Sequence, residues 1–365
     1  MRLRSLACVT VLCLALGACA GTPPIVDAAG RPVPGSVAAM ESVTLGGIAQ
    51  SVWFRARDQR ALPLIVLHGG PGVSEAALFR HFDADLEDDF LVVHWEQRGT
   101  GRSYPPARDA PPTLERLLGD LDELVEHVRR RFGASRVALL GHSFGTVLAL
   151  RYAHAHPDKV AVSVSVAQVV APVAGDRLGY HYALSEAARR RDDAALESLR
   201  RIGPPPHDVD QTLALGRHLE RYGGVFHGDL STGKLIWAAL SEPEVTLLDI
   251  VRFGQGNRFS LETLTAELNA LDLRSLDRFD VPIVFIEGRH DWRTPSSLAE
   301  SYWNVLKAPC KRLVWFEASA HNPPFEQPRA FVDVMRTEVL PIARGQACEG
   351  AAVRSIDRGQ RSQVR

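Results

Sequence analysis

The chain has 365 residues, of which 45% are hydrophobic, so it can form one large α/β domain with an insertion or two ordinary domains. Its 42 Lys and Arg residues balance 43 Asp and Glu residues, and the formal net charge of -1 creates no overall field that favours nucleic acid. We therefore expect a small-molecule or short-peptide substrate and no nucleic-acid partner.

Residues 1–20 are typical of a signal peptide. A basic start is followed by an apolar stretch at 6–16 that is too short to span a membrane, and then by small residues. The sequence LGAC resembles a bacterial lipoprotein signal, in which Cys19 is lipid-modified and becomes the first mature residue. The alternative is an A-x-A cleavage site at 18–20, which would release a soluble protein. Both predict export to the bacterial periplasm, and the first predicts a membrane contact only through the lipid at Cys19.

Residues 21–40, rich in Gly, Pro and Ala, predict a flexible tether, and weak alternation over 42–57 predicts an antiparallel edge hairpin. Helical stretches follow, such as 113–132, where Leu and Val recur at helical spacing. Between them lie apolar, β-branched runs that predict strands buried on both faces, at 62–67, 90–95, 137–140, 160–166 and 283–286. Such alternation predicts an α/β fold with a mostly parallel central sheet and helices on both faces.

The alternation stops over residues 173–271. This region has helical pieces and Gly- or Pro-rich breaks, but no run typical of a buried strand, so it predicts a helical cap rather than a second independent core. The predicted core therefore comprises 41–172 and 272–345. Beyond it, the polar residues 351–365 carry four arginines and predict a disordered basic tail.

Two cysteines, Cys310 and Cys348, lie in the mature part of the chain. Two thiols in an exported protein favour pairing. Cys310 precedes a predicted strand at 312–316, and Cys348 follows a predicted helix at 326–342 that should run back antiparallel to that strand, which would bring the two residues close. Two unrelated free thiols remain the alternative, because spacing does not establish connectivity.

The strongest chemical signal is the G-x-S-x-G pattern GHSFG at residues 141–145, placed after the strand run at 137–140 and before the helical stretch at 146–154. A tight strand-to-helix turn strains the backbone of the serine, and flanking glycines avoid clashes. This context predicts Ser143 as a nucleophile.

A serine nucleophile needs a base, and the base needs an acceptor that orients it. In an α/β-hydrolase fold these partners follow the serine in the order acid, histidine, each on a loop after a late strand. Asp291 follows the predicted strand 281–287, and His321 follows the predicted strand 312–316. We therefore expect a triad of Ser143, His321 and Asp291 that needs no metal and no organic cofactor.

Backbone amides must stabilise the oxyanion that forms on the substrate. One is expected from Phe144, immediately after the nucleophile. The second is expected from the HGGPG loop at 68–72, where glycines let the backbone approach the substrate closely. We assign Gly70 as this donor, with the substrate-contacting Gly69 as the alternative.

The HGGPG loop, the WEQRGTGRS motif at 95–103 and the serine turn together resemble the proline iminopeptidase family of α/β-hydrolases, over about residues 43–340. The resemblance implies a helical cap over the active site and, in true members, removal of an N-terminal residue, usually proline, from a peptide. The chain departs from the family pattern with Glu96 in place of Asp and Ala320 in place of Gly.

The family anchors the free amino group of its substrate with cap glutamates in a Trp-Glu context, which this chain lacks. An ammonium group buried without carboxylates would be strongly disfavoured. The acidic cap residues that could substitute are Glu220, which we take as the substrate-binding candidate, Glu242 and Glu244.

The sequence as a whole predicts a serine hydrolase that works through an acyl-enzyme and acts as an aminopeptidase on short peptides. An esterase, amidase or lactonase acting on a small acyl substrate is the alternative. A non-catalytic binding lipoprotein on the same scaffold is a third interpretation.

Overall fold

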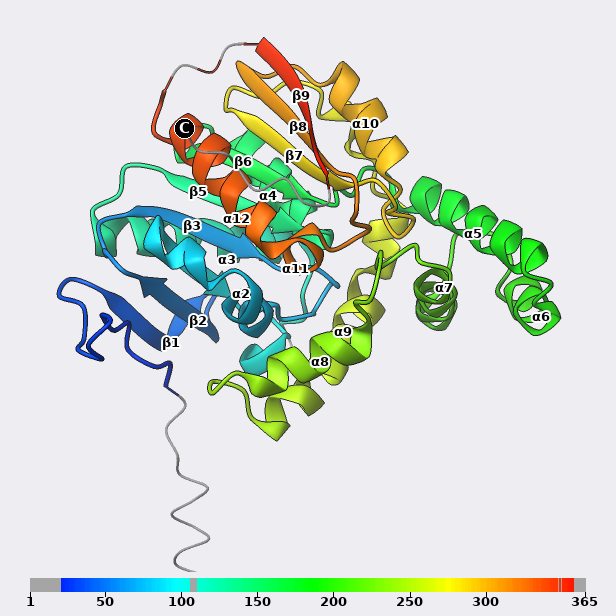
Figure 1. Cartoon of the computed structure of the whole chain (residues 1–365), viewed down its shortest axis with the longest axis horizontal. Coiled ribbons are helices and arrows are strands. Elements are labelled where there is room, and N and C mark those ends of the chain that lie inside the picture. The colour runs from blue at the N-terminus through cyan, green and yellow to red at the C-terminus, as the bar shows by residue number, and fades with distance from the viewer. Residues whose placement is uncertain (1–20, 106–109, 347, 349, 358–365) are drawn as a thin grey trace, which may run out of the picture.

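A computed structural model of the chain describes residues 21–105, 110–346, 348 and 350–357. The predicted signal peptide and the lipidation site Cys19 lie outside the described residues. The described part forms one nine-stranded sheet in the order β1-β2-β4-β3-β5-β6-β7-β8-β9, covered by helices and extended at one side by a helical cap (Figure 1).

The sheet is antiparallel at its first edge and parallel elsewhere. Strands β1 and β2 form a hairpin, and β2 runs antiparallel to β4, whereas every later pair is parallel. The central strands are buried along their whole length, as the apolar runs predict. The strands are β1 (Val37–Leu45), β2 (Ile48–Ala56), β3 (Leu62–Leu67), β4 (Phe90–Trp95), β5 (Val137–His142), β6 (Val160–Val166), β7 (Ile283–Gly288), β8 (Cys310–Phe316) and β9 (Gly350–Ile356). The predicted fold class is confirmed.

Helices pack on both faces of the sheet, each over its own apolar core. One core includes side chains of α3 (Leu114–Phe132), α4 (Phe144–Ala155) and α10 (Ser296–Val305). The opposite core includes side chains of α2 (Ala76–Phe82) and of a C-terminal helical run. That run consists of α11 (Pro323–Glu326), α12 (Pro328–Val334), a π-helical turn (Met335–Val339) and α13 (Leu340–Ala343). Short 3-10 turns lie at η1 (Ala84–Asp88), η2 (Gly101–Ser103) and η3 (Leu273–Ser275).

The insertion between β6 and β7 is helical and has two parts. The first three helices share a small separate core built around Tyr180, Leu199 and Leu215, and they project from the sheet as an arm (Figure 1). The last two helices lie beneath this arm and pack against α2 and η2. The cap helices are α5 (Pro172–Arg189), α6 (Asp193–Ile202), α7 (Val209–Arg221), α8 (Thr232–Ser241) and α9 (Leu247–Asn269).

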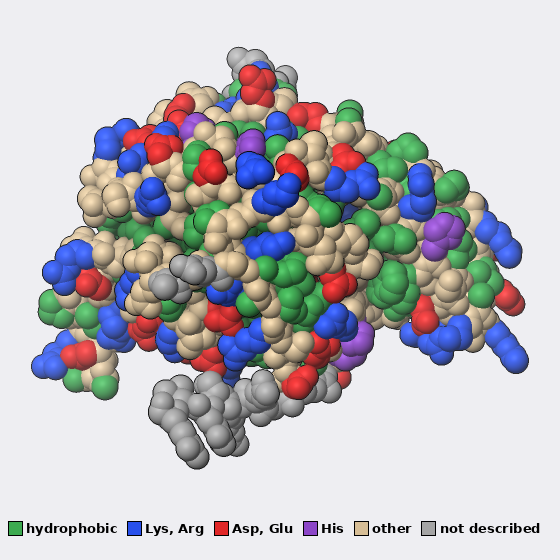
Figure 2. Space-filling model, turned by 90° about the horizontal axis from the view of Figure 1, so that it is seen from above, with side chains coloured by type: hydrophobic (Ala, Val, Ile, Leu, Met, Phe, Trp, Pro, Cys, Tyr) green, Lys and Arg blue, Asp and Glu red, His purple; other side chains and the backbone are tan. Residues whose placement is uncertain are grey.

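On the face shown in Figure 2, acidic and basic side chains are interspersed, and neither sign of charge dominates. This distribution agrees with the balanced composition of the chain. Among the described residues, no helix combines the length and the apolar character needed to cross a bilayer.

The predicted disordered tail at 351–365 is wrong over its first residues, because Gly350–Ile356 forms strand β9. This strand pairs with β8 over seven positions, from Cys310↔Gly350 to Phe316↔Ile356. Cys310 and Cys348 form a disulfide with a Cα–Cα distance of 5.5 Å, which holds the chain beside the start of β8. Main-chain pairing to an existing strand edge thus orders a segment whose side chains are nearly all exposed.

The predicted tether at 21–40 is wrong as well. Strand β1 already begins at Val37, and the preceding residues form a small bridge between Val26 and Pro32. Thr22 accepts a hydrogen bond from Arg55 of β2 and donates one to Glu244 of the cap. Gly- and Pro-rich composition is compatible with an ordered, hydrogen-bonded path along the domain surface.

Candidate active site

Ser143 lies in the tight turn between β5 and α4. Its backbone has φ 51° and ψ -120°, a left-handed conformation that few non-glycine residues adopt. A Cβ atom on Gly145 would lie 1.8 Å from the carbonyl oxygen of Leu67, and one on Gly141 would lie 2.6 Å from that of Gly145. Gly145 is therefore required for the turn to pack against the end of β3, and Gly141 is required for the turn itself to close.

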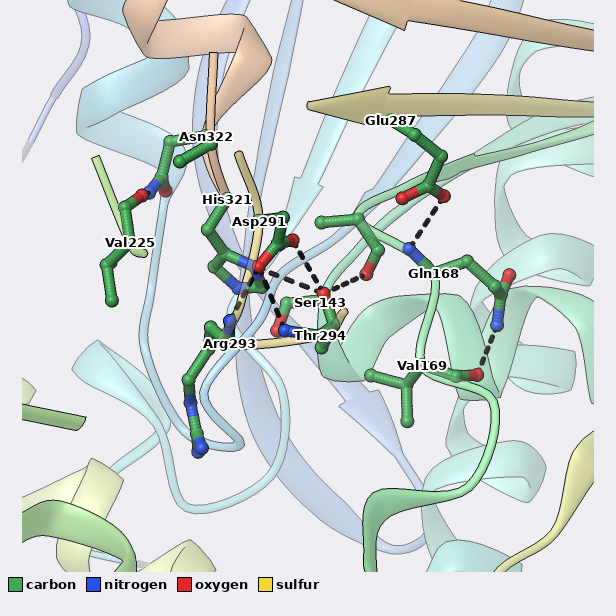
Figure 3. Close-up of polar contacts among 12 residues, drawn as sticks. Ser143, Gln168, Val169, Val225, Glu287, Asp291, Arg293, Thr294, His321 and Asn322 are labelled. Carbon is green, nitrogen blue, oxygen red and sulfur yellow. Dashed lines mark hydrogen bonds and ion pairs between the residues drawn. The ribbon is translucent and has the colours of Figure 1, made fainter. Parts of the chain in front are cut away.

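Asp291 and His321 face each other at the carboxyl ends of β7 and β8. The Nδ1 of His321 lies 2.8 Å from Oδ2 of Asp291, and both residues are buried (Figure 3). The other oxygen of Asp291 accepts the backbone N–H groups of Arg293 and Thr294 at 2.7 and 2.9 Å. The Thr294 hydroxyl donates to Asp291 at 2.8 Å. Four donors thus hold this carboxylate in one orientation toward the imidazole.

Glu326 fixes the loop that carries His321. Its carboxylate accepts the backbone N–H groups of Ala320 and Asn322, on either side of the histidine, at 2.9 and 3.0 Å. It also accepts the N–H of His227, in the cap, at 2.5 Å. The N–H of His321 itself donates to the carbonyl of Val225 at 3.0 Å. The cap segment between α7 and α8 therefore helps to position the predicted base.

Glu326 also provides a pH-dependent test of this arrangement. Burial raises its pKa from 4.5 to about 7, against the lowering effect of the three amides. The folded chain thus holds this proton more tightly than the unfolded chain, so the group favours folding most below about pH 4.5, and this contribution is lost as the pH rises to about 7.

We expect Glu326→Gln, which has no proton to lose, to gain unfolding free energy relative to the wild type between about pH 5 and pH 8. Urea denaturation at both pH values measures this difference. Glu300→Gln, an exposed change on α10, should show no such trend. An equal difference between Glu326→Gln and wild type at both pH values would contradict the prediction.

Beneath Ser143, a buried pair of residues joins two loops of the site. The Nδ1 of His142 lies 2.7 Å from Oε1 of Glu75, and its Nε2 lies 3.0 Å from the carbonyl oxygen of His321. Burial lowers the pKa of His142, but the Glu75 carboxylate outweighs this effect and the pKa is raised. A protonated His142 can donate to both partners, and so it ties the His321 loop to α2.

Glu75 also decides between the two candidate oxyanion donors. Its Oε2 accepts the backbone N–H of Gly69 at 3.2 Å, so that amide is already engaged. The N–H of Gly70 has no acceptor among the described residues, and Gly70 lines the same cavities as Ser143. Its φ of 111° is one that L residues rarely adopt. The geometry therefore favours Gly70 over the alternative Gly69, with Phe144 at the first position of α4 as the second predicted donor.

A cavity of about 620 Å³ lies between the core and the cap, and both Ser143 and His321 line it. Its cap side is largely apolar. The apolar lining there comes from α7, α8 and α9, and includes Leu213, Leu235, Ile236, Ile250 and Phe253. The predicted nucleophile and base thus face a space large enough for a small organic substrate or a short peptide.

Four carboxylates line this cavity, namely Glu75, Glu96, Glu220 and Asp249. Glu75 faces a histidine, as described above, and Asp249 forms a salt bridge of 3.0 Å with Arg102. Within the described part of the chain, neither Glu96 nor Glu220 forms a salt bridge. Burial raises the pKa of Glu96, against the hydrogen bond from Ser74.

The three acidic cap residues differ in what they contact. Glu220 lines the cavity and accepts the backbone N–H and the hydroxyl of Thr232 at 2.9 and 2.8 Å. Glu242 lies 2.9 Å from a ring nitrogen of His81. Glu244, in the connection between α8 and α9, is buried and accepts a hydrogen bond from Thr22. Neither residue lines the cavity. Over residues 21–105, 110–346, 348 and 350–357, no cluster of His, Cys, Asp and Glu could hold a metal ion.

Sequence reasoning missed Glu75, Thr294 and Glu326. Each supports a predicted site residue but lies outside every motif that the sequence shows. Their neighbour His142, which contacts Glu75, does lie inside a motif, the G-x-S-x-G pattern. Glu75 contacts His142 across 67 residues of sequence and Glu326 contacts His227 across 99, whereas Thr294 lies only three positions after Asp291 but belongs to no motif.

Comparisons with known proteins agree with this architecture. A family model described as the alpha/beta hydrolase fold matches residues 63–202. A probable aminopeptidase, YbaC, of Bacillus subtilis is 32% identical over 310 residues, which cover 83% of this chain and 97% of that protein. The proline iminopeptidase of Neisseria gonorrhoeae is 36% identical over 113 residues, but these cover only 31% of this chain and 34% of that relative.

The crystal structure of a proline iminopeptidase from Mycobacterium smegmatis has a TM-score of 0.59 and 22% sequence identity, and covers 84% of this chain and 99% of that one. At this identity the match supports the fold alone. The similarity to the Bacillus subtilis relative extends over nearly its whole length and includes the cap. The chain therefore belongs to the proline iminopeptidase-like family of α/β-hydrolases.

Proposed function

We propose that this hydrolase is a serine aminopeptidase that releases an N-terminal residue from short peptides through an acyl-enzyme. The observation that carries the serine chemistry is that Ser143, in its strained turn, and His321, hydrogen-bonded to Asp291, line one cavity. The peptide specificity rests on the aminopeptidase and iminopeptidase relatives, together with the carboxylates that line the cavity.

In the proposed reaction, Nε2 of His321 takes the proton of Ser143 as its Oγ bonds to the substrate carbonyl carbon. Asp291 stabilises the imidazolium and keeps Nδ1 protonated. The amides of Gly70 and Phe144 donate to the oxyanion. His321 then gives its proton to the leaving amine as the C–N bond breaks, and water, deprotonated by the same imidazole, hydrolyses the ester on Ser143.

An aminopeptidase must neutralise the α-ammonium group of its substrate, because an unpaired buried cation is strongly disfavoured. Glu220 lies on the cap side of the cavity, forms no salt bridge in the described part of the chain, and retains lone pairs beyond those used by Thr232. We assign the ammonium to this carboxylate. Glu96, which is more deeply buried and whose pKa is raised by burial, is the alternative partner for the ammonium group.

We expect Glu220→Gln to raise KM for aminoacyl anilides about tenfold, because the amide keeps the contact with Thr232 but removes the negative charge. Its effect on p-nitrophenyl esters that lack an amine should be small. Glu242→Gln, an acidic cap residue outside the cavity lining, is the matched control. Equal KM values for anilides in the wild type and Glu220→Gln would remove Glu220 from this role.

The apolar cap side of the cavity favours a second candidate function, an esterase, amidase or lactonase that acts on a small acyl substrate. The two functions differ in their need for a free amine. Acetylation of the substrate's N-terminus should abolish turnover by an aminopeptidase. Undiminished turnover of the acetylated peptide would establish the second candidate.

A further inference from the structure

Apolar side chains gather on the outer side of the cap, on α8 and the first turns of α9. The largest exposed fractions there are 75% for Trp237 and 79% for Leu247. Of the nine large hydrophobic side chains exposed in the described part of the chain, five lie on these two helices and four are scattered elsewhere. We call these five the cap apolar face: Ile236, Trp237, Leu247, Leu248 and Val251. The two helices contact each other, and exposed apolar side chains gathered on neighbouring elements are typical of an interaction site.

The local structure turns the three side chains on α9 away from the core. On α9, Leu247 and Leu248 lie four and three positions before Val251, which places them on one side of the helix. The other side of the same turn carries Asp249, which pairs with Arg102 of the core, and Ile250, which lines the cavity. Pairing on the inner side thus fixes which side of α9 faces outward.

The N-terminal end of the described chain lies beside this face. The hydroxyl of Thr22 donates to Glu244 at 2.6 Å, in the short connection between α8 and α9. The Arg55 guanidinium donates to the carbonyl of Pro23 at 2.9 Å, which holds the segment in place. In Figure 1 this end of the chain and α8 both lie at the lower side of the molecule. Cys19, the residue with the lipidation signal, precedes Thr22 by three positions, at most about 10 Å of extended chain.

We propose that the cap apolar face is a membrane-docking surface that binds a phospholipid bilayer, next to a lipid carried by Cys19. A lipid at that position keeps Glu244, and with it the start of α9, near the bilayer surface. Trp237 is suited to the membrane–water interface, and Leu247 and Leu248 to the acyl region just below it. Two attachment points orient a protein on a membrane, whereas one anchor leaves it free to tumble.

Docking also has a consequence for the cavity. Ile236 belongs both to the cap apolar face and to the cavity lining. The wall of the cavity therefore lies at the bilayer surface, where apolar peptides and acyl compounds are concentrated by partitioning. This inference concerns the outside of the cap and does not depend on the chemistry proposed for Ser143.

Tryptophan fluorescence of the full-length chain on vesicles of phosphatidylethanolamine and phosphatidylglycerol with brominated acyl chains tests the proposal. Four of the six tryptophans are buried, and Trp292 is half-buried and stacked on Tyr182, so quenching by the lipids reports mainly on Trp237. We expect quenching with a blue shift in the wild type. We expect both signals to be lost in Trp237→Phe.

Vesicle partitioning of the chain from residue 20 onward, which carries neither the apolar stretch at 6–16 nor a lipid at Cys19, separates the face from the lipid anchor. We expect this chain to bind vesicles, and the added changes Leu247→Asn and Leu248→Asn to reduce its partition coefficient about tenfold or more. Val305→Asn, on an exposed valine of α10, is the matched control and should leave binding unchanged. Circular dichroism verifies that each variant folds.

Three results would overturn the proposal. The first is an unquenched Trp237 in a wild-type chain that is bound to vesicles, which would mean that the lipid alone makes the contact. The second is equal partitioning of the chains with and without the leucine changes. The third is concentration-dependent protection of Trp237 from iodide without vesicles, together with a dimer in sedimentation, which would assign the face to a second copy of the chain.

Discussion

Replacing Ser143 with alanine should lower kcat/KM by about 10⁴-fold or more on either an aminoacyl anilide or a p-nitrophenyl ester. In the proposed mechanism the acyl group has no other attachment point, because His321 and Asp291 move and orient a proton. The alanine variant should fold, because it adds no atoms to a turn whose closest contacts involve Gly141 and Gly145. Steady-state kinetics with both substrate types measure the loss.

The matched control for this variant is Ser163→Ala on β6. The hydroxyl of Ser163 is buried and has no hydrogen-bond partner among the described residues, so its removal should leave activity and stability nearly unchanged. If Ser143→Ala kept a tenth or more of the wild-type rate on a folded chain, another group would have to be the nucleophile.

Replacing Asp291 with asparagine should reduce kcat by about 10³- to 10⁴-fold with little change in KM. The carboxylate accepts from Nδ1 of His321 at 2.8 Å and from the backbone N–H and hydroxyl of Thr294. The amide has one oxygen, and the backbone N–H groups of Arg293 and Thr294, which both donate to Oδ1 in the wild type, are expected to bind it. An NH₂ group then faces His321 and favours the tautomer with its proton on Nε2, which cannot accept a proton from Ser143.

Asp280→Asn is the comparison for this change. Asp280 precedes β7, at the opposite end of that strand from Asp291, so the variant should retain wild-type kinetics. A loss of the same size in both variants would show that the effect arises from destabilisation of β7. A loss of less than tenfold in Asp291→Asn would contradict the orienting role.

The central sheet could be predicted because burial leaves a strong pattern in the sequence. The run at 160–166 matches β6 residue for residue, and the run at 62–67 matches β3. Strands covered on both faces must be apolar at nearly every position, which few other structures require. The order of the sheet's motifs then placed Ser143, Asp291 and His321 at the same edge of the sheet.

Strand β9 could not be predicted for the opposite reason. Its side chains are exposed apart from Ile356, so neither alternation nor a buried run marks it. It is held by main-chain pairing with β8, which does not depend on side-chain type, and the disulfide at Cys348 lies just before it. Residues 21–36 were missed for another reason, because their contacts with Arg55 and Glu244 are distant in sequence.

The residues that support the site could not be predicted from the sequence either. Glu75 and Glu326 accept hydrogen bonds from backbone N–H groups, and Thr294 donates to Asp291 on its own loop. A carboxylate that accepts buried amides looks, in sequence, like any surface glutamate. The cap could be predicted only in part. Its helical character follows from its composition, but its division into the arm α5–α7 and the layer α8–α9 does not.

The most direct test of the account is to treat the folded chain with a fluorophosphonate and map the adduct by peptide mass spectrometry. A single adduct is expected on Ser143, and it should form far more slowly in His321→Ala, where no imidazole can remove the hydroxyl proton. An adduct on another residue would contradict the account, and so would labelling of Ser143 at the wild-type rate without His321.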